Sequence, residues 1–157
     1  MAVQSGSRNH RSSRHAFIMY DRLVSEHKPL RVLVYSDDRE VRAAVLAALG
    51  AHPHPDLPAF EYVECATEPV VFQHLDGGDI DLVILDGEAV PVGGLGIARQ
   101  MKDEIFQAPP VLVLTGRPQD AWLATWSRAE AALAHPIEPI RLAEVVIDLA
   151  RGVLQPG

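Results

Sequence analysis

Short apolar segments alternate with segments of helical periodicity from residue 30 onward. Residues 30–35 are mainly apolar and β-branched and end at Ser36, Asp37 and Asp38, which predicts a strand. The next stretch predicts a helix, because apolar residues recur every three or four positions until Gly50, a typical C-cap residue. Repetition of this pattern predicts strands at residues 30–35, 60–65, 82–85, 111–114 and 131–134, with helices near 41–49, 69–75, 94–105, 118–126 and 139–153.

The alternation predicts an α/β fold with a five-stranded parallel sheet. Strands that are apolar on both faces call for helices on both sides, joined by right-handed crossovers. The last helix carries an apolar stripe, which we expect to pack on the sheet: Leu142, Val145, Val146, Leu149 and Val153. We predict the doubly wound, flavodoxin-like strand order 2-1-3-4-5.

Length and composition fit one folded domain after a tail. The chain has 157 residues, of which 48% are apolar and 22% charged, as in an ordinary globular protein. Residues 1–28 are polar and arginine-rich and mostly lack periodicity, so we predict a disordered basic tail and a folded domain at 29–157. The single cysteine, Cys65, excludes an intramolecular disulfide and favours a reducing compartment.

The predicted domain is acidic. Residues 29–157 hold nine Lys or Arg against nineteen Asp or Glu, whereas residues 1–28 hold five against two. An acidic body argues against direct DNA binding, which needs a basic face to replace counterions on phosphates. The apolar run at residues 16–20 is too short for a membrane span or a secretion signal. We therefore expect a cytoplasmic protein without membrane association.

Polar residues follow four of the five predicted strands. They are Ser36, Asp37 and Asp38 after the first, Asp86 after the third, Thr115 and Gly116 after the fourth, and His135 and Pro136 after the fifth. In an open parallel sheet, ligands bind beyond the carboxyl ends of the strands, near the point where strand order reverses. We expect these carboxylates, the hydroxyl and the imidazole to converge there.

These segments resemble the receiver domains of two-component response regulators, and the resemblance covers residues 30–153. Residues 81–86 (DLVILD) look like the family's strand-three signature, and Gly94 lies eight positions after Asp86, where the family places a glycine. Residues 112–116 (LVLTG) look like strand four. Residues 134–139 (AHPIEP) look like the segment that normally reads Thr-Lys-Pro-Phe-x-Pro.

The resemblance implies that Asp86 accepts a phosphoryl group from a histidine kinase as an aspartyl phosphate. It also implies a Mg²⁺ ion held by Asp37, Asp86 and the backbone carbonyl of Glu88. Thr115 would hydrogen-bond the phosphate, and His135 would supply the cation opposite it. Such a domain is a signalling module rather than an enzyme, and it acts by contact with a downstream protein or as a homodimer.

The same resemblance implies that Gly116 leaves space for the phosphate and that the peptide bond before Pro136 is cis. Departures from the family pattern, among them the altered loop at residues 91–94, leave open a pseudo-receiver that binds partners without phosphorylation. Ser36 replaces one of two usual acids, which should weaken Mg²⁺ binding unless Asp38 turns inward instead of capping a helix. His135 replaces lysine, and an unperturbed histidine is largely neutral at pH 7. Ala132 stands where the family often has an aromatic residue.

Two further alternatives concern function and surface. Asp86-Gly-Glu88 is faintly similar to the nucleophile motif of haloacid-dehalogenase phosphatases, although that family places the motif after the first strand of its core. Trp122 and Trp126 lie four residues apart on one predicted helix, so they either anchor a partner or pack into the protein's own core.

Overall fold

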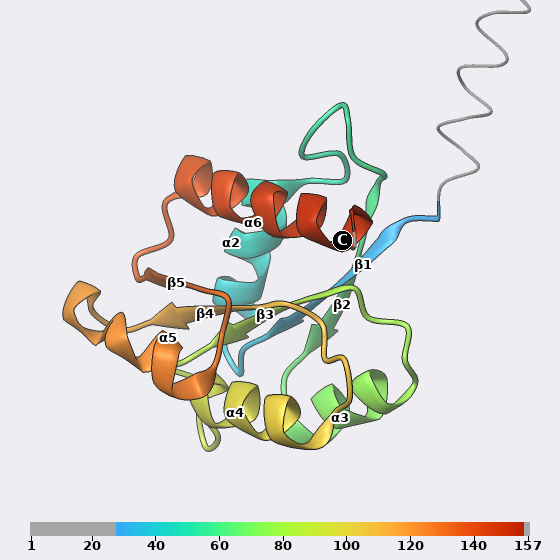
Figure 1. Ribbon diagram of the computed structural model, residues 1–157. Coiled ribbons are helices and arrows are strands. Elements are labelled where there is room, and N and C mark those ends of the chain that lie inside the picture. Colours follow the sequence, from blue (N-terminus) through green and yellow to red (C-terminus); the bar gives the residue numbers. More distant parts are fainter. Residues whose placement is uncertain (1–27, 156–157) are drawn as a thin grey trace, which may run out of the picture.

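The computed structural model describes residues 28–155, so the predicted tail lies outside the described residues except for Lys28. Five strands alternate with helices, as the sequence predicts (Figure 1). The strands are β1 (Leu30–Tyr35), β2 (Phe60–Cys65), β3 (Leu82–Asp86), β4 (Val111–Thr115) and β5 (Ala131–Ala134). The helices are α2 (Arg39–Leu49), α3 (Glu68–Asp76), α4 (Gly94–Glu104), the 3₁₀ turn η1 (Pro118–Asp120), α5 (Trp122–Ser127) and α6 (Pro139–Leu154).

All five strands are parallel, and their order is β2-β1-β3-β4-β5, which confirms the predicted topology. Val32 pairs with Leu82 across β1 and β3, and Ile84 pairs with Leu112 across β3 and β4. The strand order therefore reverses between β1 and β3, so the edge beyond Tyr35 and Asp86 is the expected ligand site.

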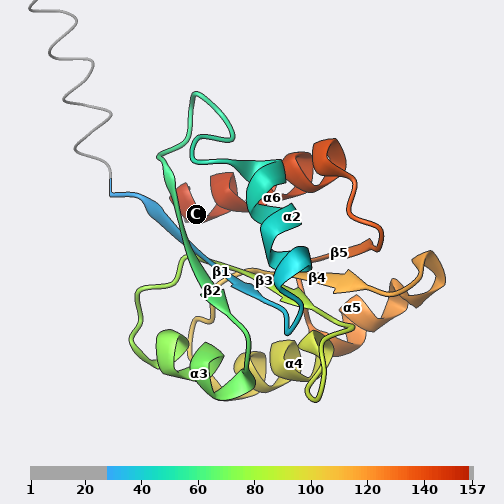
Figure 2. The same cartoon turned by 180° about the vertical axis from the view of Figure 1, so that it is seen from behind.

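Two apolar cores lie on opposite faces of the sheet. Helices α2 and α6 cover one face, and α3, α4 and α5 cover the other (Figures 1 and 2). Because side chains alternate along a strand, Val32 and Val34 pack under α2 and α6, whereas Leu33 and Tyr35 belong to the opposite core. Burial on both faces explains why the central strands have almost no polar positions.

The segment after β4 differs from the predicted single helix that begins at Pro118. Pro118 opens a 3₁₀ turn, in which the backbone N–H of Ala121 donates to the Pro118 carbonyl, and α5 begins only at Trp122. The side chains of Arg117 and Asp120 form an ion pair across this 3₁₀ turn. Trp122 and Trp126 are 64% and 47% exposed, so neither fills the core.

Within the part of the chain that the structure describes, no helix has the length and apolarity needed to span a bilayer.

Candidate functional site

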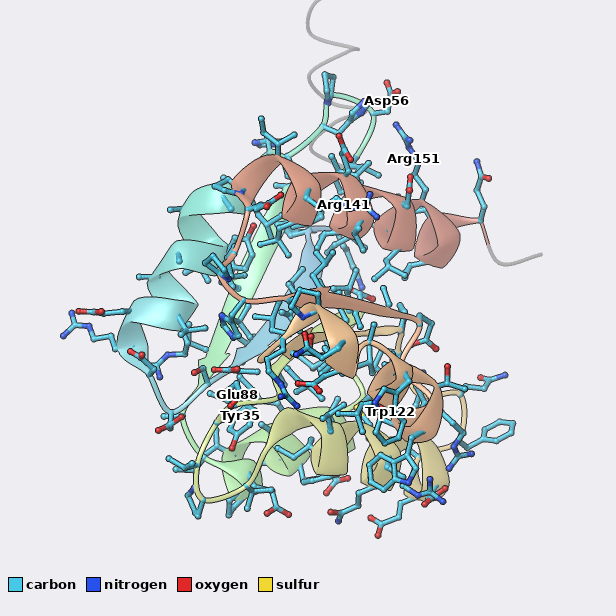
Figure 3. All side chains as sticks on the ribbon, turned by 90° about the vertical axis from the view of Figure 1, so that its left-hand side faces the viewer. Tyr35, Asp56, Glu88, Trp122, Arg141 and Arg151 are labelled. Carbon is cyan, nitrogen blue, oxygen red and sulfur yellow. The ribbon has the colours of Figure 1, made fainter. Side chains whose placement is uncertain are left out.

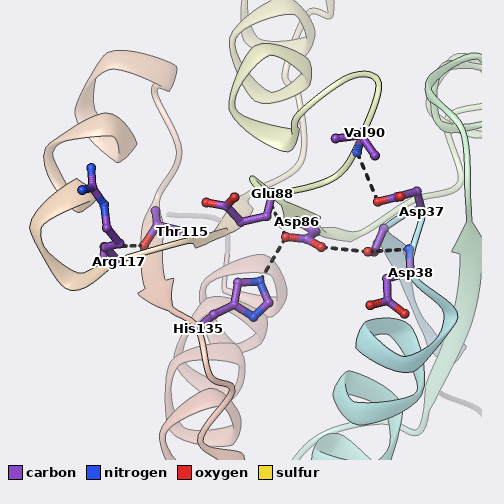
Figure 4. Close-up of polar contacts among 9 residues, drawn as sticks. Asp37, Asp38, Asp86, Glu88, Val90, Thr115, Arg117 and His135 are labelled. Atoms are coloured by element: carbon purple, nitrogen blue, oxygen red, sulfur yellow. Dashed lines mark hydrogen bonds and ion pairs between the residues drawn. The ribbon is translucent and has the colours of Figure 1, made fainter.

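An open pocket of about 650 Å³ lies at the carboxyl edge of the sheet. It is lined by Asp37, Asp38, Val41, Asp86, Glu88, Gly116, Arg117 and His135. Figure 4 shows most of these side chains around Asp86. The structure therefore brings together residues that follow β1, β3, β4 and β5. Ser36, Thr115 and Pro136 are expected at this edge but do not line the pocket.

Asp86 is the last residue of β3, and its side chain is only 4% exposed. Three groups engage its carboxylate. The Ser36 hydroxyl donates to Oδ2 at 2.8 Å, the Glu88 backbone N–H donates to Oδ1 at 2.9 Å, and Nε2 of His135 lies 3.0 Å from Oδ1 (Figure 4). A buried carboxylate is costly unless it is hydrogen-bonded, so this set of contacts compensates for its burial.

Ser36 links Asp86 to the start of α2. Its buried Oγ also accepts a hydrogen bond from the Asp38 backbone N–H at 3.0 Å. The Asp38 carboxylate accepts from the Glu40 N–H at 2.8 Å, which makes Asp38 the N-cap of α2. This contact agrees with the capping role considered for Asp38, and its exposed side chain also lies at the rim of the pocket.

Asp37 holds the loop that follows β3. Its Oδ1 accepts a hydrogen bond from the Val90 N–H at 3.1 Å. Nearby, the Tyr35 hydroxyl donates to the Val92 carbonyl at 2.5 Å. Burial raises the pKa of Tyr35, and the negative charges of Asp37, Glu68 and Asp86 raise it further, so the phenol stays a donor. The loop is thus fixed at two points beside Asp86.

Thr115 is the last residue of β4, and His135 directly follows the adjacent strand β5. The His135 backbone N–H donates to the Thr115 carbonyl at 2.8 Å, which carries the pairing of β4 and β5 to the edge of the site. The peptide bond between His135 and Pro136 is cis, as expected. The buried Thr115 hydroxyl donates to the Arg117 carbonyl at 3.2 Å. To bind a phosphate, the Thr115 hydroxyl would have to give up its hydrogen bond to the Arg117 carbonyl.

The Glu88 side chain occupies the space beside Gly116. A Cβ atom built on Gly116 would overlap the carboxylate of Glu88, so only a glycine allows the two residues to lie this close. The resemblance to receivers implies that this space is room for a phosphate, and it implies a role only for the Glu88 backbone. The orientation of the Glu88 side chain depends on its rotamer and on the neighbouring loop, and no sequence motif indicates it.

Arg117 is a pocket residue that the sequence analysis missed. Its guanidinium donates to both carboxylate oxygens of Asp120 at 3.0 and 3.1 Å. Hydrogen bonding and attraction to Asp120, followed by the charge of Glu88, raise the pKa of Arg117. A usable signal was present, because Arg117 comes directly after Gly116 at the carboxyl end of a buried strand.

The charges of the pocket suit a hard cation. Four carboxylates line it, from Asp37, Asp38, Asp86 and Glu88, against one guanidinium already paired with Asp120 and one imidazole. Among residues 28–155, no three His, Cys, Asp or Glu side chains are arranged to hold a metal ion. The carboxylate oxygens that line the pocket are the type of donor that Mg²⁺ prefers, and an ion that keeps several water ligands needs only one or two of them.

Comparisons with known proteins agree with this fold. Two uncharacterized response regulatory proteins of Mycobacterium tuberculosis, from strains CDC 1551 and H37Rv, are each 60% identical to the chain over 122 residues, which cover 78% of this chain and 92% of the relative. No family model matches the chain.

Solved receiver structures share the architecture. A CheY-like receiver domain protein from Methanospirillum hungatei matches with a TM-score of 0.66 and 16% identity, over 83% of this chain and 100% of that one. The chemotaxis response regulator CheY4 of Vibrio cholerae matches with a TM-score of 0.66 and 18% identity, over 78% of this chain and 99% of that one. The fold is that of a receiver domain. The chain belongs to the response regulators of two-component signalling.

Proposed function

We propose that this response regulator accepts a phosphoryl group on Asp86 from the phosphohistidine of a histidine kinase. The observation that carries the proposal is the position of Asp86: it is buried at the end of β3, yet its carboxylate lines an open pocket at the point where strand order reverses. Membership of the response regulators supports the same reading. The protein would act in the cytoplasm, in agreement with its single buried cysteine.

In the proposed transfer, a carboxylate oxygen of Asp86 forms a bond to phosphorus while the phosphorus–nitrogen bond of the kinase phosphohistidine breaks. The electron pair of that bond stays on the leaving imidazole nitrogen. The Glu88 N–H and Ser36 hydroxyl orient the carboxylate, and His135 lies beside it to face the added negative charge. Thr115 would hydrogen-bond the new phosphate after releasing the Arg117 carbonyl.

Asp37, Asp86 and the Glu88 backbone carbonyl are the proposed protein ligands of Mg²⁺. When bound, the cation supplies the positive charge that lets an anionic donor approach a carboxylate. Asp37 and Asp86 both line the pocket, whereas Ser36 provides a neutral hydroxyl in place of a second acid after β1. We infer that the ion is held weakly.

The decisive experiment incubates the purified protein with Mg²⁺ and acetyl phosphate and measures its intact mass. We expect a gain of one phosphoryl group in the wild type and none in Asp86→Asn, which keeps the shape of the side chain. An equal gain in both proteins would place the modification elsewhere. Continuous hydrolysis of an unrelated phosphoester would instead favour the phosphatase class.

A phosphorylation-independent binding module is the second candidate, and the contacts of Asp86 favour it. Three donors within the chain already use most of the roughly four acceptor positions of that carboxylate. Such an arrangement keeps Asp86 stable without a phosphoryl group. No mass gain with any small donor, together with unchanged partner binding by Asp86→Asn, would support this candidate.

Signalling in either case would proceed by contact with a downstream protein or by homodimerisation. Helix α5 presents Trp122 to solvent (Figure 3). The guanidinium of Arg99, on α4, lies 4.8 Å from the ring centroid of Trp126. Exposed tryptophans and arginines are the residues that most often carry binding energy at protein interfaces. We propose this surface of α4 and α5 for the contact.

A further inference from the structure

Glu88 combines two contacts with the phosphoryl site. Its backbone N–H donates to Asp86 Oδ1, which fixes the residue next to the proposed phosphoryl acceptor. Figure 4 shows the Glu88 side chain beside Asp86. The Glu88 carboxylate lies against Gly116, the residue that follows β4. The side chain thus lies between the proposed acceptor and the residue that the family resemblance assigns to phosphate space.

A carboxylate in this place resembles a phosphoryl group in charge and in its acceptor oxygens. Two anions cannot share the same small space without strong repulsion, which is greatest where water is partly excluded. Glu88 is exposed to solvent, so its side chain has room to swing out of the pocket. Arg117 is the neighbouring cation, and its guanidinium is attracted by Glu88 as well as by Asp120.

We propose that the Glu88 carboxylate occupies the phosphoryl side of the Asp86 pocket and must swing out before a phosphoryl group enters. The proposal rests on the proposed function and adds a residue that controls access to the acceptor. Glu88 is then a positioning residue: it sets how readily anionic donors reach Asp86 and takes no part in bond making.

The test compares Glu88→Ala, Glu88→Gln and the matched control Asp38→Asn. Each variant removes one negative charge from the same pocket, and asparagine remains a good N-cap, so the control keeps α2 intact. We expect Glu88→Ala to raise the rate of mass gain with acetyl phosphate on the order of tenfold, since it removes both the charge and the obstruction. Glu88→Gln should give a smaller gain, and Asp38→Asn the smallest.

An equal rate in Asp38→Asn and Glu88→Ala would overturn the proposal, because it would show that only the total charge of the pocket matters. A rate in Glu88→Ala at or below that of the wild type would overturn it as well. If the wild type gains mass while the three variants behave like it, the inference fails and the proposed function stands.

A second readout does not depend on phosphoryl transfer. Binding of inorganic phosphate is followed by the NMR shifts of the Gly116 and Arg117 backbone amides, in the wild type and in Glu88→Ala. Tighter binding by the variant, on the order of tenfold, supports the proposal even if no protein gains mass from acetyl phosphate. Equal affinities overturn it.

Discussion

At the scale of single residues, the site is organised around one buried acid and the groups that satisfy it. Ser36 and His135 depart from the usual receiver pattern, yet both contact Asp86 directly, at 2.8 and 3.0 Å. The two substitutions therefore change the charges around Asp86 but keep both side chains in contact with it. A hydroxyl replaces a negative charge on one side of Asp86, and an imidazole replaces an ammonium on the other.

Replacing His135 by lysine tests whether this position supplies the cation of the site. Lysine stays protonated throughout the neutral range, so it would oppose the phosphate charge at every working pH. We expect His135→Lys to raise the yield of aspartyl phosphate about threefold or more at pH 8, and His135→Ala to lower it. The measurement is intact mass after reaction with acetyl phosphate at pH 6 and 8. Equal yields from the lysine and alanine variants would remove His135 from that role.

At the scale of helices and strands, the sequence predicts best where one face or both faces of an element must be buried. All five strands lie where the apolar pattern places them. The signal is strongest in the central strands, because burial on both faces leaves them few polar positions. Helix α5 was harder to predict, since six residues are too few to show a period. The four-residue spacing of Trp122 and Trp126 does not by itself indicate whether Trp122 faces solvent or the core.

The sequence predicts which residues reach the site at the strand ends, but it does not predict how the side chains in the loops are oriented. The sequence predicts the positions of Asp37, Asp86 and His135 at the sheet edge, because these residues lie at the ends of predicted strands. The contact of Glu88 with Gly116 and the pairing of Arg117 with Asp120 depend on rotamers and on a 3₁₀ turn. Apolar periodicity carries no information about either.

The N-cap of α2 gives a prediction about one helix. Removing the Asp38 carboxylate leaves the Glu40 N–H without its partner, so Asp38→Ala should lower the free energy of unfolding by about 0.5–2 kcal/mol. Asp38→Asn should lower it much less, because its side-chain oxygen also caps. Urea unfolding followed by circular dichroism measures both. Identical midpoints for the alanine variant and the wild type would contradict the capping role.

At the scale of the whole molecule, the two cores share one sheet and should unfold together. Leu142, 1% exposed on α6, packs in one core, and Cys65, 1% exposed at the end of β2, packs in the other. Burial raises the pKa of Cys65 from 9.0 to about 11, against a smaller opposing effect of Arg42. Above pH 9 the unfolded chain therefore loses a proton that the folded chain retains, and stability falls as pH rises. At pH 8 the folded thiol is protonated and unreactive.

Alkylation of Cys65 can thus detect unfolding that is caused by a mutation in the core on the opposite face of the sheet. Leu142→Ala leaves a cavity under α6 and should cost about 2–5 kcal/mol. If opening is global, alkylation of Cys65 at pH 8 accelerates about thirtyfold or more, because each 1.4 kcal/mol changes the open population tenfold. Ile140→Ala is the matched control, since Ile140 lies on the same helix but is 78% exposed. Unchanged alkylation in Leu142→Ala, with a lowered urea midpoint, would mean that the α2–α6 side opens alone. The site between β1 and β3 would then join two independently opening halves, and a change of charge at Asp86 could alter one face while leaving the other in place.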